Sequence, residues 1–69
     1  MIFVFKTSVK NKLQVQQLKP FIDKQLPDAK WNFDLKDRDN ILRVDHHENV
    51  VLTIKGLLNS CNFYCEELE

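Results

Sequence analysis

The chain has 69 residues, of which 43% are hydrophobic and 29% charged, with ten basic and ten acidic side chains. A chain of this length forms one domain and buries only about 60% of its unfolded surface, so its stability is modest. The zero net charge argues against a nucleic-acid or anionic-membrane surface, and no apolar run is long enough to span a bilayer.

The chain begins with a predicted strand over residues 2–5, which are β-branched or aromatic. Residues 9–11 form a predicted loop, in which Asn11 is suited to cap the start of a helix.

A helix follows this loop. Leu18, Ile22 and Leu26 recur every four residues, which is the spacing of a buried helical face. Pro20 lies inside this helix, lacks a backbone donor and is expected to bend it. Pro27 is expected to end it.

Two further strands come next. Apolar residues alternate with polar ones over 31–35, which predicts a half-buried strand. Residues 36–40 form a charged turn. Residues 41–44 predict a third strand.

The last third of the chain predicts a second helix and a fourth strand. Residues 45–48 form a polar connection, and Asn49 can cap the helix. Asn62 is suited to a left-handed helix terminus, and residues 63–67 predict the last strand. The helix has one apolar face, made of Ile54, Leu57, Leu58 and Cys61.

The predicted order βαββαβ favours an α+β, ferredoxin-like domain over residues 1–69. Two right-handed βαβ halves interleave into a four-stranded antiparallel sheet of order 4-1-3-2, with both helices on one face.

These elements resemble the heavy-metal-associated (copper-chaperone-like) domain family along nearly the whole chain. The order and spacing of the matching residues carry the resemblance. They are Phe5-Lys6-Thr7, Leu18, Pro20, Phe21, Trp31, Asp34-Leu35, Ile41-Leu42, Val44, Ile54, Leu57, Leu58, Cys61 and Asn62-Phe63.

The resemblance implies that the family's metal site is lost. Family members bind Cu(I) or another soft ion through two loop cysteines spaced CxxC, because soft ions prefer thiolate sulfur. Those two positions fall on Asn11 and Gln14, whose amides cannot become anionic soft ligands. Lys10 and Lys12 add charge that repels a cation. We therefore expect no metal and no other cofactor.

Two cysteines are candidate metal ligands outside the loop before the first helix. Cys61 and Cys65 are the only thiols, and both fall on predicted core-facing positions, where free cysteine behaves as a small hydrophobe. A residual metal site that uses Cys61 remains an alternative.

Adjacent histidines form a second group of candidate ligands. His46 and His47, between Asp45 and Glu48, are expected at the opposite end of the domain from Asn11. We interpret them as a solvated polar turn, with weak binding of a borderline ion as the alternative.

Nothing in the sequence indicates an enzyme. There is no Ser/His/Asp set that converges in this topology, and the single glycine excludes a phosphate-binding glycine loop. Two cysteines are too few for a secreted disulfide framework, and the apolar start lacks a basic leader, so we expect a cytoplasmic protein.

Strand alternation predicts an apolar patch on the uncovered face of the sheet. Ile2, Val4, Ile41 and Tyr64, with Arg43, are expected to point to that face, where they are candidates for contact with a protein partner or a second copy. The residues expected to face the helices are Phe3, Phe5, Trp31, Phe33, Leu35, Leu42, Val44, Phe63 and Cys65.

The sequence favours a non-catalytic protein-interaction module. Lys10, Lys12 and Lys19 are suited to an acidic partner. The alternatives are a residual metal-binding or metal-trafficking protein that uses Cys61 or the histidines, and a small regulatory domain that binds a metabolite.

Overall fold

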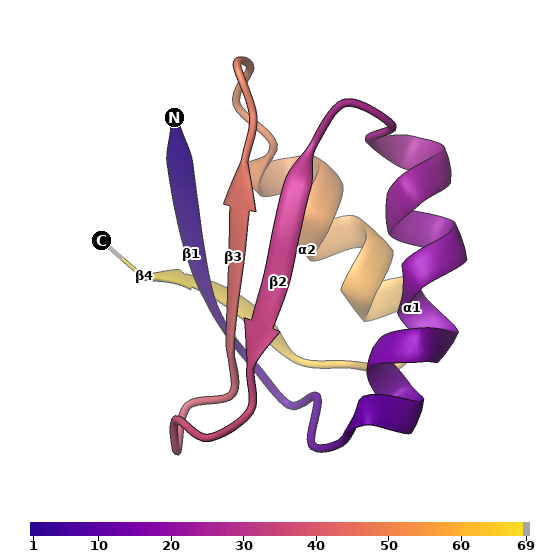
Figure 1. Ribbon diagram of the computed structural model, residues 1–69, viewed down its shortest axis with the longest axis vertical. Helices are drawn as coiled ribbons and strands as arrows, with labels where there is room; N and C mark the ends of the chain where they lie inside the picture. The colour runs from indigo at the N-terminus through magenta and orange to yellow at the C-terminus, as the bar shows by residue number, and fades with distance from the viewer. Residues whose placement is uncertain (69) are drawn as a thin grey trace.

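The chain folds into a four-stranded antiparallel sheet with two helices on one face (Figure 1). The computed structural model describes residues 1–68. The strand order is β2-β3-β1-β4, which confirms the predicted ferredoxin-like arrangement. The elements are β1 (Ile2–Thr7), α1 (Lys12–Gln25), β2 (Lys30–Asp34), β3 (Ile41–Asp45), α2 (Val51–Ser60) and β4 (Cys65–Leu68).

The core lies between the sheet and the helices, as strand alternation predicts. Phe5, Leu42 and Ile54 are fully buried, and they come from two strands and a helix. Trp31, Phe33, Leu35 and Phe63 are half-buried and pack against this core from its margins. Within residues 1–68, neither helix has the length and apolar character needed to cross a bilayer.

Two asparagines allow the chain to reverse direction. Asn40, in the turn between β2 and β3, has φ 49°, and Asn62, after α2, has φ 67°. Asparagine tolerates this left-handed region better than other residues with side chains, apart from glycine. At Asn62 the backbone forms a Schellman motif, because Phe63 N–H donates to Leu58 C=O (2.9 Å) and Asn62 N–H donates to Asn59 C=O (3.0 Å).

Several element bounds differ from the prediction. β1 ends at Thr7 instead of residue 5, β2 covers Lys30–Asp34 instead of 31–35, and β3 ends at Asp45 instead of residue 44. β4 begins at Cys65 instead of residue 63, because the Schellman motif holds Phe63 at the helix end. The prediction of Asn49 as the cap of α2 is wrong, because α2 begins at Val51 and Val50 is its N-cap. The Asn49 side chain lies one residue earlier, where it accepts a hydrogen bond from Val51 N–H (2.9 Å). α1 continues through Pro20, which is exposed to solvent.

Two leucines of α1 provide a matched test of the core. Leu18 is 1% exposed and Leu13 is 65% exposed. We expect Leu18→Ala to lower the free energy of unfolding by about 2–5 kcal/mol, because it removes buried methyl groups and leaves a cavity. Leu13→Ala should change it by less than about 0.5 kcal/mol. Urea unfolding followed by circular dichroism measures both, and equal losses would contradict the predicted core.

Candidate functional site

The turn that begins α1 is closed by Asn11 and Gln14, the two side chains that stand where the resemblance places the family's cysteines. Asn11 Oδ1 accepts a hydrogen bond from Gln14 N–H (2.9 Å), which confirms Asn11 as the N-cap. Gln14 Oε1 accepts a hydrogen bond from Lys10 N–H (2.7 Å). We call this pair of bonds the amide clasp (Asn11 and Gln14). It resembles a capping box, in which two side chains satisfy backbone donors at a helix start.

The amide clasp directs its oxygen acceptors to backbone N–H groups. Both oxygens therefore stabilise the helix start. A neutral amide oxygen is also a poor match for a soft cation, which prefers thiolate sulfur. The chemistry of this turn is thus that of a self-capped helix start.

The segment that leads into the clasp is fixed by a buried hydroxyl. Thr7 Oγ1 donates to Asn40 C=O (2.7 Å) and accepts from Val9 N–H (3.2 Å). Thr7 is the one buried polar residue among residues 1–68. These bonds tie the end of β1 to the turn between β2 and β3, so both segments at this end of the domain are held together.

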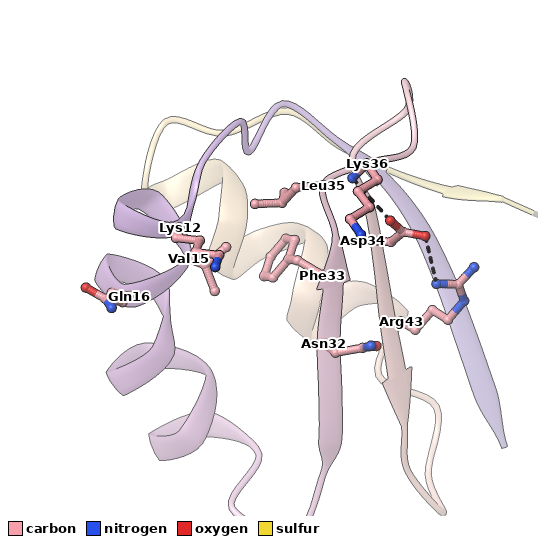
Figure 2. A pocket seen from close by; sticks show the side chains of 9 residues that line it. All are labelled: Lys12, Val15, Gln16, Asn32, Phe33, Asp34, Leu35, Lys36 and Arg43. Atoms are coloured by element: carbon pink, nitrogen blue, oxygen red, sulfur yellow. Dashed lines mark hydrogen bonds and ion pairs between the residues drawn. The ribbon is translucent and has the colours of Figure 1, made fainter.

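A groove lies beside this helix start, between α1 and β2. Its volume is about 620 Å³, and we call it the α1–β2 groove. Figure 2 shows Val15 of α1 and Phe33 of β2 pointing toward one another across it, with Leu35 next to them. The nine residues that line it are Lys12, Val15, Gln16, Asn32, Phe33, Asp34, Leu35, Lys36 and Arg43.

The α1–β2 groove runs over the free edge of the sheet. β2 pairs only with β3, so alternate residues of β2 direct their N–H and C=O groups away from the sheet. The lining includes Phe33, which faces the helices, and Asn32, which points to the other face (Figure 2). The groove therefore exposes the backbone of β2 together with apolar side chains.

The charge in the groove is basic. Asp34 forms an ion pair with Arg43 (3.8 Å) and accepts a hydrogen bond from Lys36 N–H (3.2 Å). Among residues 1–68, neither the Lys12 nor the Lys36 ammonium takes part in an ion pair. Two uncompensated positive charges thus flank the apolar part of the groove.

The other end of the helix–strand junction is closed by a bridge centred on Trp31. The indole Nε1–H donates to Asp23 Oδ1 (3.0 Å), and Lys19 Nζ lies 2.7 Å from Asp23 Oδ2. Lys19 also lies over the Trp31 ring, 5.9 Å from its centroid. The hydrogen bonds from Lys19 and Trp31 lower the pKa of Asp23. Lys19 therefore forms an ion pair on the surface, whereas Lys10 and Lys12 form none among residues 1–68.

The four apolar residues predicted for the open sheet face do not form a continuous patch. Ile41 is only 5% exposed, whereas Ile2 is 62% and Tyr64 is 53% exposed. Tyr64 precedes β4, and its N–H donates to Ser8 Oγ (2.8 Å). Charged side chains interrupt the surface, because Val4 lies opposite Arg43 and the Lys6–Glu66 pair separates Val4 from Tyr64.

The two cysteines occupy different environments. Cys65 is buried, and this burial raises the pKa of its thiol to about 11, although the charge of Lys55 opposes the shift. Cys61 is half-buried at the end of α2, where it lines a second groove with Phe21. Among residues 1–68, neither cysteine belongs to a cluster of three metal-ligating side chains.

The histidines lie at the end of the domain opposite the amide clasp, as predicted. The predicted companions of His46 and His47 were Asp45 and Glu48. Glu48 does lie beside His47, with its Oε1 3.4 Å from His47 Nε2, whereas Asp45 pairs with the amino group of Met1. The structure also brings Asp28 to the histidines, from the loop between α1 and β2.

Comparison of the chain with family models, curated proteins and solved structures gives no match. The family resemblance therefore depends on the residue pattern alone.

The sequence did not predict two residues of the α1–β2 groove. Lys36 was interpreted as part of a charged turn and Phe33 as a core residue, although both line the groove. The sequence signal that could have indicated the groove was the alternation of apolar and polar residues over 31–35, together with Val15 on the flank of the helix. That signal gives the face of each side chain, but not the spacing between α1 and β2.

The thiols give a test of burial by reactivity. At pH 8 we expect a thiol reagent to modify Cys61 before Cys65, because the thiolate is the reactive form and Cys65 stays protonated. Mass spectrometry of protein labelled with iodoacetamide measures both rates. Cys61→Ser should leave a slow thiol and Cys65→Ser a fast one, and equal rates would contradict the burial of Cys65.

Proposed function

We propose that this domain is a non-catalytic protein-interaction module that holds an acidic, extended segment of a partner in the α1–β2 groove. The observation that carries the proposal is an open edge strand, β2, beside apolar side chains and two lysines, Lys12 and Lys36, that form no ion pair within residues 1–68.

The edge of β2 supplies the backbone part of this recognition. An extended segment that adds to an edge strand forms main-chain hydrogen bonds, which give affinity without requiring a particular sequence. The amide clasp starts α1 at a defined position next to this edge, so the groove has a fixed wall.

Side chains supply the specificity. Alternate residues of an added strand point to opposite faces, so one set would meet Val15, Phe33 and Leu35, which favour apolar partners. Lys12 and Lys36 favour acidic residues in the same segment, because opposite charges steer association and select the partner.

The polar groups of the domain support a role without catalysis. Among residues 1–68, every buried side-chain nitrogen and oxygen has a hydrogen-bond partner. Thr7, the buried polar residue, uses its hydroxyl to hold the backbone. These buried polar groups thus serve the structure of the domain.

We further propose that the chain is a divergent relative of the heavy-metal-associated domain in which the amide clasp replaces the metal-binding thiolates. The two clasp side chains are spaced as the family's cysteines are, and they order the same turn through hydrogen bonds.

Peptide binding tests the groove. The probe is a synthetic peptide of about eight residues in which glutamate and valine alternate, a length that matches an ordinary strand. We expect it to shift the NMR signals of Val15 and Phe33 and to slow hydrogen exchange of β2 amides. Lys12→Glu should weaken binding roughly tenfold, because it reverses a charge beside the bound segment.

Lys24→Glu is the matched control, since Lys24 lies on the same helix outside the groove. It should leave the affinity within about twofold of the wild type. The proposal fails if a peptide with lysine in place of glutamate binds equally well, or if both charge reversals have the same effect. A dimer of the protein alone that Lys12→Glu dissociates would identify a second copy as the occupant and would also contradict the proposal.

Restoring two cysteines tests the family relationship. We expect the double variant Asn11→Cys/Gln14→Cys to bind one Cu(I) tightly, because two thiolates at a helix start suit a soft ion. Competition with a chromogenic Cu(I) chelator measures the affinity. Each single variant and the wild type, which retains Cys61 and Cys65, serve as controls. A folded double variant that binds no more tightly than the wild type would contradict the relationship.

A further inference from the structure

Two loops bring three metal-ligating side chains together at the end of the domain opposite the amide clasp. Asp28 comes from the loop between α1 and β2, and His46 and His47 come from the connection between β3 and α2, which lies at the same end (Figure 1). One ligand atom from each of the three residues lies within 4.8 Å of the others. We call this group the histidine cluster (Asp28, His46 and His47).

The backbone holds the histidine cluster in place. His46 N–H donates to Met1 C=O (3.0 Å), which continues the pairing of β3 with β1 beyond the strand ends. Ala29 N–H donates to Leu26 C=O (3.1 Å), which closes the turn that carries Asp28. The two loops are therefore anchored on the sheet and on the end of α1.

The donor set fits a borderline divalent cation. Two imidazole nitrogens and one carboxylate oxygen are ligands that Zn(II) takes at about 2.0–2.2 Å, and with three protein ligands it keeps a fourth position for water. In a tetrahedral site the ligand atoms lie roughly 3.3 Å apart, so the cluster must contract around the ion. Asp28 and His47 are exposed. The His46 and His47 rings stack with their centroids 4.4 Å apart, so at least one ring must rotate to point a nitrogen at the same ion.

Contacts with Glu48 orient both rings of the histidine cluster. His46 Nδ1 accepts a hydrogen bond from Glu48 N–H (3.1 Å) and lies 3.4 Å from Glu48 C=O. An ion at Nε2 requires the tautomer in which Nδ1 carries the proton and donates to that carbonyl instead. His47 Nε2 lies 3.4 Å from Glu48 Oε1, so the carboxylate can hold that ring while Nδ1 serves as ligand. Such outer partners orient metal-binding histidines in proteins generally.

We propose that Asp28, His46 and His47 form a Zn(II) site with water in the fourth position. The site is separate from the α1–β2 groove and uses no thiol, so its existence does not depend on the proposed function.

Titration of the untagged protein with Zn(II) by calorimetry tests this site. We expect one Zn(II) per chain, and His47→Ala or Asp28→Asn should weaken binding by at least about tenfold. Glu67→Gln is the matched control, because it removes one exposed carboxylate from β4 and should leave the affinity unchanged.

NMR of the wild type gives a second readout that needs no variant. Zn(II) should move the ring proton signals of both histidines in a saturable, one-to-one manner. The proposal is overturned if those signals do not move, if His47→Ala binds as the wild type does, or if Cys61→Ser alone abolishes binding.

Discussion

The amide clasp fixes the start of α1, and the position of the α1–β2 groove depends on that start. Gln14 N–H donates to Asn11, and Lys10 N–H donates to Gln14, so the first turn is closed by the chain itself. Because α1 begins at Lys12, the side chains of Lys12 and Val15 face β2 at the mouth of the groove. A turn that depended on a bound ion would place the same side chains only when the ion was present.

The two ends of the α1–β2 junction have different properties. At one end the bridge from Trp31 to Asp23 joins helix to strand. At the other end Val15 and Phe33 leave a hollow that no side chain of residues 1–68 fills. The first contact holds the helix against the sheet, so the second can stay open without loosening the core.

The sequence predicts the fold well because its signals are local. Alternation places Phe3 and Phe5 inside, and the helical repeat places Leu18 and Ile22 inside. The site was less predictable, because it depends on distances between segments far apart in the chain. Asp28 joins the histidines only when two loops meet, and Ile41 is buried because its strand lies between two others, where Lys6 and Asp34 flank it.

The two edge strands of the sheet, β2 and β4, lie in surroundings of different charge. β4 forms the margin opposite β2, and it presents Glu66 and Glu67, both exposed. Charged side chains on an edge strand oppose pairing with a further strand, and acidic side chains repel an acidic segment most strongly. An acidic segment is thus repelled by the glutamates of the β4 edge and attracted by the lysines beside the β2 edge. If the domain binds an acidic segment as proposed, this asymmetry limits binding to the β2 edge, so one strand is added to each domain.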